Sequence, residues 1–180
     1  MFITSISYAY EIQLFHLLES SNTPNNILPA ILYKKAFGAD LDNPAEFLEK
    51  RFKQNNWSNA WKDSIYPFNH FHSNTHEVLG VYAGSAHVLI GGEKGKRLEL
   101  SLGDILILPA GTGHQLLQKS DDFAVVGAYP EGMKWDLFKT KSLKKSELDQ
   151  AKKNISKVPL PQSDPWTVND PKGLTLLWSE

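Results

Sequence analysis

The chain has 180 residues, of which 41% are hydrophobic and 22% are charged, a composition typical of a folded globular protein. Nineteen basic and twenty acidic residues give a formal net charge of −1, which argues against nucleic acid as a partner. The chain contains no cysteine, so disulfides, thiolate nucleophiles and cysteine-ligated metal sites are excluded. Any metal ion must therefore be bound by histidine nitrogen and carboxylate oxygen.

The first twenty residues are fairly apolar, but they lack the basic start and the small-residue cleavage site of a signal peptide. Glu11 and other polar residues interrupt this run, whereas a membrane-spanning helix needs about 20 apolar residues. We therefore expect a cytoplasmic protein that does not enter a membrane. Periodicity leaves open whether residues 1–20 form an edge strand or an irregular lead-in, and residues 20–26 (SSNTPNN) have the composition of a turn.

Two segments follow before the most regular part of the sequence. Residues 27–37 (ILPAILYKKAF) predict a strand, and Pro29 favours a position at the edge of a sheet, where a missing N–H does no harm. Residues 55–63 (NNWSNAWKD) are interpreted as a loop that carries two tryptophans. We expect these tryptophans to anchor the loop on the core, with the lining of a ligand pocket as the alternative.

Two helices are predicted on either side of a β-rich region. Asn43 can cap the first helix, at residues 44–55, because Pro44 suits the first helical position and Glu46 can complete a capping pair. The second helix is expected at residues 144–157, where apolar residues recur on one side. The tail beyond it is proline-rich and reads as extended, with a last strand from Leu174 to Trp178.

From residue 65 to about residue 128, short apolar runs alternate with glycine, proline, asparagine and aspartate. Several short strands at this spacing indicate an all-β sandwich or barrel. The expected strands are Tyr66–His72, His76–Tyr82, Ser85–Ile90, Arg97–Leu100, Ile105–Leu108, His114–Gln118 and Phe123–Ala128.

A cluster of candidate metal ligands begins this β-rich region. His70 and His72 are two residues apart, so both imidazoles point to the same face of a strand. Residues 73–75 (SNT) have a turn-forming composition, and the chain then resumes as a strand that contains Glu77. If Glu77 faces inward with the two histidines, alternation turns the neighbouring His76 away.

A second segment, residues 103–114 (GDILILPAGTGH), supplies a further histidine. Its strand–turn–strand pattern is of a length that brings His114 back beside the first three candidates. Three neutral imidazoles and one carboxylate suit a divalent transition metal such as Fe, Mn, Ni, Zn or Cu. An octahedral ion with these four ligands keeps two positions for substrate, water or dioxygen.

These two segments resemble the two conserved motifs of the cupin superfamily. The matching positions are His70-x-His72, four residues, Glu77, six residues and Gly84 in the first, and Gly103, five residues, Pro109-x-Gly111, two residues and His114 in the second. Ser64 and Gln118 stand where the motifs usually have glycine and asparagine. Some cupins have three residues before the acidic ligand, and that spacing would select His76 in place of Glu77.

The resemblance implies an all-β fold, a double-stranded β-helix or cupin jelly-roll barrel with a few peripheral α-helices. It implies a single domain over residues 1–180, with a barrel core at about 64–130. The N-terminal segment 1–63 and the C-terminal helix and tail 140–180 would pack on this core. The metal ligands would be His70, His72, Glu77 and His114, near one mouth of the barrel, and a homodimer is expected.

The longer strings HxHSNTHEVLG, LPAGTGH and GAYPEG resemble a mostly bacterial family of uncharacterised cupin-domain proteins. The first hypothesis is a metal-dependent enzyme that acts on a small molecule, by dioxygenation first and by isomerase or lyase chemistry next. The alternative is a non-catalytic module that binds or senses a sugar or another small metabolite. A metal-free sugar-nucleotide isomerase is a third hypothesis, and the complete ligand set counts against it.

Overall fold

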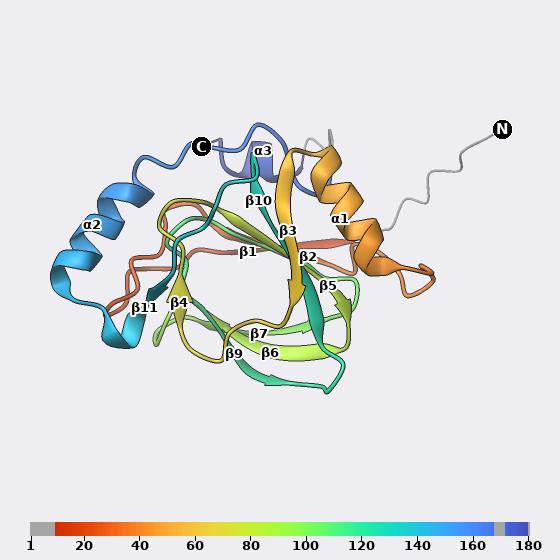
Figure 1. Ribbon diagram of the computed structural model, residues 1–180, viewed down its shortest axis with the longest axis horizontal. Helices are drawn as coiled ribbons and strands as arrows, with labels where there is room; N and C mark the ends of the chain where they lie inside the picture. The colour runs from red at the N-terminus through yellow and green to blue at the C-terminus, as the bar shows by residue number, and fades with distance from the viewer. Residues whose placement is uncertain (1–9, 168–171, 180) are drawn as a thin grey trace.

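Two antiparallel sheets form the framework of the computed structural model, which describes residues 10–167 and 172–179 (Figure 1). The six-stranded sheet has the order β1 (Glu11–Phe15), β2 (Ala30–Lys34), β8 (Ile105–Leu108), β5 (Glu77–Ala83), β10 (Ala124–Pro130) and β3 (Trp57–Asp63). The five-stranded sheet has the order β11 (Phe138–Lys139), β4 (His70–Phe71), β9 (His114–Lys119), β6 (Ser85–Ile90) and β7 (Lys96–Ser101). This is the predicted double-stranded β-helix of cupin type, so the fold-class prediction is confirmed.

Side-chain alternation explains why the central strands of the six-stranded sheet are apolar throughout. On β8, Leu106 and Leu108 belong to the core between the two sheets, whereas Ile105 and Ile107 belong to a second core on the outer face. All four side chains are buried, so this sheet is covered on both faces. The alternation also places Glu77 and Leu79 of β5 on the same, inner face of the sheet.

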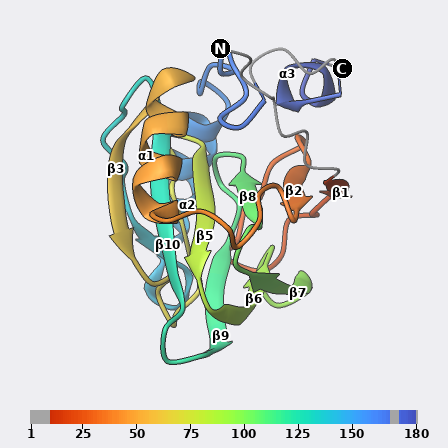
Figure 2. The same cartoon turned by 90° about the vertical axis from the view of Figure 1, so that its right-hand side faces the viewer.

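The helices cover the outside of the barrel. Helix α1 (Pro44–Gln54) begins as predicted, because the Asn43 side chain accepts from the Glu46 backbone N–H and Pro44 occupies its first turn. It lies against β3, β5 and β10 (Figure 2). Its Leu48 and Phe52 side chains are buried. The remaining helical elements are η1 (Thr140–Ser142), α2 (Lys145–Ile155) and α3 (Leu174–Leu177).

Three local predictions are wrong. Strand β2 lies between β1 and β8 rather than at an edge, because Pro29 precedes the strand and removes no ladder hydrogen bond. Residues 57–63, interpreted as a loop, form β3, an edge strand whose polar side chains face solvent. The apolar run that ends in Trp178 is a short helix instead of a strand, since so few residues show no decisive period.

The segments outside the motifs contribute strands as well as helices. Strands β1, β2 and β3 all precede residue 64, and all three are hydrogen-bonded members of the six-stranded sheet. Part of the N-terminal prediction concerns residues 1–9, which lie outside the described residues. The division of the chain into domains stays a prediction.

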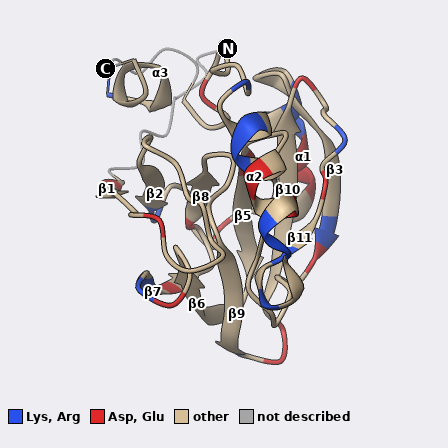
Figure 3. Cartoon of the chain, turned by 90° about the vertical axis from the view of Figure 1, so that its left-hand side faces the viewer, with Lys and Arg blue, Asp and Glu red and all other residues tan. Residues whose placement is uncertain are grey.

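Charges of both signs are spread over the exposed elements. Helix α2 carries lysines together with Glu147 and Asp149, and both colours are visible on it in Figure 3. Among the helices that the structure describes, each is too short or too polar to cross a membrane.

Candidate metal centre

The two sheets meet at the candidate site, because its residues come from both. His70 on β4 and His114 at the start of β9 are directly opposed partners in the five-stranded sheet. Glu77 begins β5 in the other sheet, and His72 lies in the connection between β4 and β5. All four side chains are buried. The two predicted motifs are therefore brought together by strand pairing.

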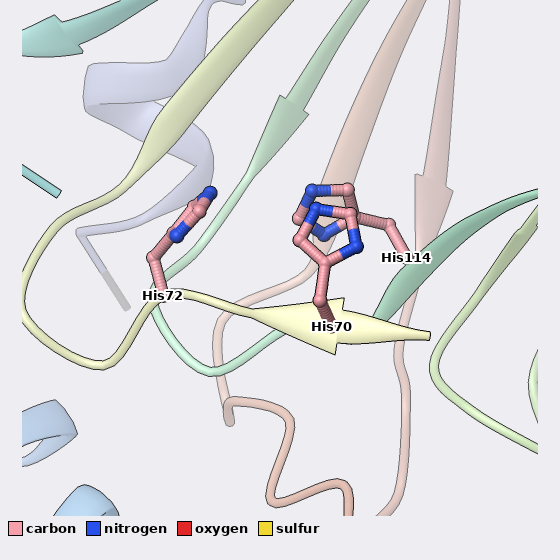
Figure 4. Close-up of side chains that lie close together, drawn as sticks. All are labelled: His70, His72 and His114. Atoms are coloured by element: carbon pink, nitrogen blue, oxygen red, sulfur yellow. The ribbon is translucent and has the colours of Figure 1, made fainter. Parts of the chain in front are cut away.

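The three imidazoles converge on one point. One ring nitrogen from each of His70, His72 and His114 lies within 4.8 Å of the corresponding nitrogen of the other two. Figure 4 shows the rings of His70 and His114 next to each other above β4. Their centroids are 4.0 Å apart. His72 approaches from the connection beyond the end of the strand.

Hydrogen bonds to the backbone fix the tautomer of each imidazole. The Nδ1 atoms of His70 and His114 lie 3.0 Å from the carbonyl oxygens of Phe68 and Thr112, and Nδ1 of His72 bonds the carbonyl of Asp136. A carbonyl oxygen only accepts, so each Nδ1 carries the proton. The lone pair of each ring is then on Nε2, free to ligate, which is the arrangement of metal-binding histidines whose other nitrogen is held in place.

Glu77 presents one satisfied and one unsatisfied oxygen to the site. Its Oε1 accepts from the Tyr129 hydroxyl at 2.9 Å, and that hydroxyl accepts from Trp61 Nε1 at 2.7 Å. Its Oε2 is buried without a well-aligned hydrogen bond from any described residue, although Nε2 of His114 and of His72 lie 3.2 and 3.5 Å away. An anionic oxygen that faces two lone pairs requires a cation or a proton between them.

The pKa shifts of the metal-free cluster point to the same need for a positive charge. Burial raises the pKa of Glu77, but the facing His72 and His114 outweigh it and hold this pKa below its usual range. Burial lowers the pKa of His72, but Glu77 outweighs it and the net pKa is raised. Burial, with the neighbouring His114, lowers the pKa of His70 to about 2. The pKa shifts of His72 and Glu77 both favour a positive charge beside the Glu77 carboxylate, which a metal ion would also supply.

His76 does not join this cluster. Its Nδ1 accepts from the Ala110 backbone N–H at 3.0 Å, and its Nε2 lies 3.2 Å from the Pro159 carbonyl. Its ring packs on Trp178, with the centroids 4.8 Å apart. Strand alternation has turned His76 to the outer face, as predicted, where it ties the turn before His114 to the C-terminal tail.

The turn at residues 109–113 depends on a glycine. Gly111 has φ of +87°, and a Cβ there would lie 2.6 Å from the carbonyl oxygen of Asn25. Its N–H donates to the carbonyl of His72 at 2.7 Å, which links the turn of the second motif to the first motif. This contact explains why the chain returns with His114 beside His72.

A cavity of about 230 Å³ adjoins the four candidate ligands. Its walls include residues that sequence reasoning did not assign to the site, since they come from β3, from the segment after it, from β10 and from the segment that follows β10. Their only sequence signal was the GAYPEG string for Tyr129 and the tryptophan-rich character of residues 55–63. Trp57 is buried in the outer core, whereas Trp61 lines the cavity, so each interpretation of this segment holds for one tryptophan.

The segment after β10 is fastened across the site. Asp136 accepts from the Ser73 backbone N–H and the Ser73 hydroxyl at 2.6 and 2.5 Å, and its own N–H donates to Asn74 Oδ1 at 3.1 Å. These contacts place the Asp136 carbonyl against His72 and the Trp135 ring 5.3 Å from the His72 ring. The segment thereby orients one imidazole and closes one side of the cavity.

One curated protein decides the family. The uncharacterized protein YjlB of Bacillus subtilis is 37% identical to this chain over 158 residues, which cover 87% of the chain and 91% of YjlB. The chain belongs to the YjlB family. No protein-family model matches the chain. Since YjlB is itself uncharacterized, membership of the YjlB family supplies no reaction, and the chemistry has to be argued from the site.

Solved structures resemble the chain at a lower level. The dTDP-6-deoxy-D-glucose-3,5-epimerase RmlC of Legionella pneumophila is 12% identical with a TM-score of 0.42, over 72% of this chain and 77% of RmlC. Acireductone dioxygenase of Bacillus anthracis, with cadmium in its active centre, is 16% identical with a TM-score of 0.37, over 50% of this chain and 60% of the dioxygenase. At these values neither likeness assigns a ligand or a reaction to the YjlB family.

Proposed function

We propose that this chain binds one divalent transition metal ion through His70, His72, Glu77 and His114 and uses it to act on a small molecule. Oxygenase chemistry is the first candidate, and isomerase or lyase chemistry the second. The observation that carries the proposal is the buried Glu77 Oε2, which has no well-aligned donor in the part of the chain that the structure describes and faces the Nε2 atoms of two imidazoles.

The donor set fits such an ion. Three imidazole nitrogens and one carboxylate oxygen are borderline ligands that suit Fe, Mn, Ni, Zn or Cu, and the sequence has no cysteine to compete. The backbone carbonyls that hold each Nδ1 provide the outer hydrogen bonds that metal-binding histidines need. When bound, a metal of this kind polarises substrate oxygen atoms as a Lewis acid or, as iron, activates dioxygen.

The residues of the chain have separate roles in this proposal. Glu77 Oε2 completes the ligand set or, when released, accepts a proton from a bound substrate. The Tyr129 hydroxyl holds Glu77 Oε1 in place, and burial with the nearby carboxylate raises the pKa of Tyr129, so it stays a donor at neutral pH. The aromatic residues around the cavity limit the entry of bulk water.

Elemental analysis of protein purified without added metal tests the proposal. We expect about one transition-metal ion per chain, since the ligands are preformed, and loss of this metal in His72→Ala with the fold retained by circular dichroism. His87→Gln is the matched control because His87 is exposed on β6, away from the site. Wild-type protein that is folded but takes up no metal would contradict the proposal.

A second measurement distinguishes an enzyme from a protein that only binds its ligand. Candidate metabolites that raise the melting temperature of the metal-loaded protein are incubated with it, with and without oxygen, and the mixture is analysed by mass spectrometry. An enzyme converts at least one such ligand, and His72→Ala abolishes the conversion. Protection without any product would identify a small-metabolite binding protein instead.

A homodimer also belongs to the proposal. Strand β1 ends the six-stranded sheet, so one of its sides has no sheet partner among residues 10–167 and 172–179, and Leu14 on it is 41% exposed. A second copy that pairs along β1 would cover both features. Sedimentation equilibrium is expected to give twice the mass of the chain, and a mass of 20.2 kDa at micromolar concentration would rule the dimer out.

A further inference from the structure

The cavity beside the candidate metal centre has an unusual wall. Beyond the four candidate ligands, it is built mainly from rings and aliphatic groups, and its volume of about 230 Å³ is below the range typical of pockets for drug-sized ligands. Flat aromatic surfaces favour ligands that stack against them. The ring-bearing and aliphatic residues of the wall are Trp61, Ile65, Tyr66, Leu79, Tyr129 and Trp135.

Free positive charge is missing from this wall. Lys62 is the one lysine or arginine among the cavity-lining residues of the described chain, and its Nζ pairs with Glu49 Oε2 at 2.9 Å. Asp63, the nearby carboxylate, accepts from the Ser64 backbone N–H at 2.7 Å. A phosphate or a second carboxylate on the ligand would therefore meet no unpaired cation.

One residue of the wall, Ser64, has a side-chain hydroxyl without a hydrogen-bond partner among the described residues. Ser64 lines the cavity, and its hydroxyl is buried. Ser64 stands six residues before His70, where the motif usually has a glycine. The substitution has thus added an unused donor and acceptor beside the cavity, on the residue that follows β3 of the six-stranded sheet, whereas His70 and His114 lie on the five-stranded sheet.

From these features we infer that the ligand is a small, flat, uncharged molecule with oxygen at two places. Adjacent oxygens face the metal centre, and a further hydroxyl or carbonyl bonds the Ser64 hydroxyl, which makes Ser64 a specificity-determining residue. The inference rests on the proposed function, because the first set of oxygens needs the metal. It accounts for each of the three features: the flat wall, the absence of free cations and the unpaired hydroxyl.

Calorimetric titration of the Mn(II)-loaded protein under nitrogen tests this inference with defined probes. Catechol carries two adjacent oxygens on a flat ring, 1,2,3- and 1,2,4-trihydroxybenzene add a third, cis-1,2-cyclohexanediol is not flat, and 3,4-dihydroxybenzoate adds charge. Catechol should bind more tightly than the diol and the benzoate. At least one trihydroxybenzene should gain about three- to tenfold over catechol, the value of one added hydrogen bond.

The Ser64 variants decide the assignment. Ser64→Ala and Ser64→Gly should keep catechol and Mn(II) affinity but lose the gain of the trihydroxybenzene. Ser58→Ala, on β3 but away from this cavity, should keep that gain. Metal content after each titration shows whether a probe has removed the ion.

Two failures are distinguishable. A chain that takes up no metal overturns the proposed function together with this inference. A chain that binds Mn(II) normally, but in which Ser64→Ala leaves every affinity ratio unchanged or the diol binds as well as catechol, overturns this inference alone.

Discussion

At the scale of single residues, the candidate centre depends on how Glu77 is held. The carboxylate is 2% exposed, and of the described residues Tyr129 is the one that gives it a well-aligned hydrogen bond. A hydroxyl that orients a metal-binding carboxylate acts through that carboxylate, so its removal should weaken metal binding without removing a ligand.

Tyr129→Phe is therefore expected to lower metal affinity about tenfold, as measured by calorimetric titration. It should also lower the free energy of unfolding of the metal-free protein by about 1–3 kcal/mol, because Glu77 Oε1 and Trp61 Nε1 both lose a partner. Tyr82→Phe, on β5 outside the cavity, should change neither quantity. Unchanged metal affinity in Tyr129→Phe would show that Glu77 needs no such support.

His76 gives the metal-free protein a pH dependence that is separate from metal binding. Burial lowers its pKa from 6.5 to about 4, so the unfolded chain takes up a proton at this position before the folded chain does. The free energy of unfolding should thus fall as the pH drops from about 6.5 to about 4, with a contribution of about 3 kcal/mol from this residue. His70, with its lowered pKa, adds to the loss in the same direction.

Urea unfolding in the presence of EDTA at several pH values measures this contribution. His76→Gln should flatten the slope by about one proton between pH 6.5 and 4.5, whereas His87→Gln, at an exposed site, should leave it unchanged. A wild-type slope that persists in His76→Gln would assign the titration to other groups.

At the scale of elements, the close packing of β3 on β10 positions Trp61. A Cβ on Gly127 would lie 2.2 Å from Trp61 Cε2, so the indole can pack this close to the backbone of β10 because Gly127 has no side chain. The pairing of the two strands shifts register between Gly127 and Tyr129, which brings the Tyr129 hydroxyl within reach of Trp61 Nε1.

Gly127→Ala is expected to destabilise the protein by about 1–3 kcal/mol, because the methyl group displaces the indole and breaks its bond to Tyr129. Chemical denaturation of Gly127→Ala, Trp61→Leu and the double variant forms the test. The loss in free energy of unfolding caused by Gly127→Ala should largely disappear in the Trp61→Leu background. Equal cost in both backgrounds would place the strain elsewhere in the sheet.

Element predictions from the sequence succeeded where the pattern was strong. Alternation predicted that if Glu77 faces inward with His70 and His72, then His76 faces away, because strand parity is local. The structure places the first three on one cavity, although from different sheets and a connection, and His76 outside it. Alternation did not identify β3, since an edge strand with a solvent-exposed face has a polar sequence much like that of a loop. The irregular pairing of β10 likewise has no local signal, so the position of Tyr129 beside Glu77 was not foreseen.

At the scale of the whole molecule, the two motifs predicted the barrel and four clustered side chains, because their spacing is a property of the fold. The walls of the cavity could not be predicted, since Trp61 and Trp135 reach it through long-range strand pairing and through the hydrogen bonds of Asp136. Much of the cavity wall therefore comes from the less regular parts of the chain, outside the motifs. This division explains why the motifs alone specify no substrate.

The central claim is that a single metal ion lies among His70, His72, Glu77 and His114. Its most direct test is anomalous diffraction from crystals of the native protein, measured on both sides of the absorption edge of the metal found by elemental analysis. We predict one strong peak per chain, within about 2.0–2.2 Å of the three Nε2 atoms and of a Glu77 oxygen. A well-ordered structure with no peak there, or with the metal held by other residues, would contradict the claim.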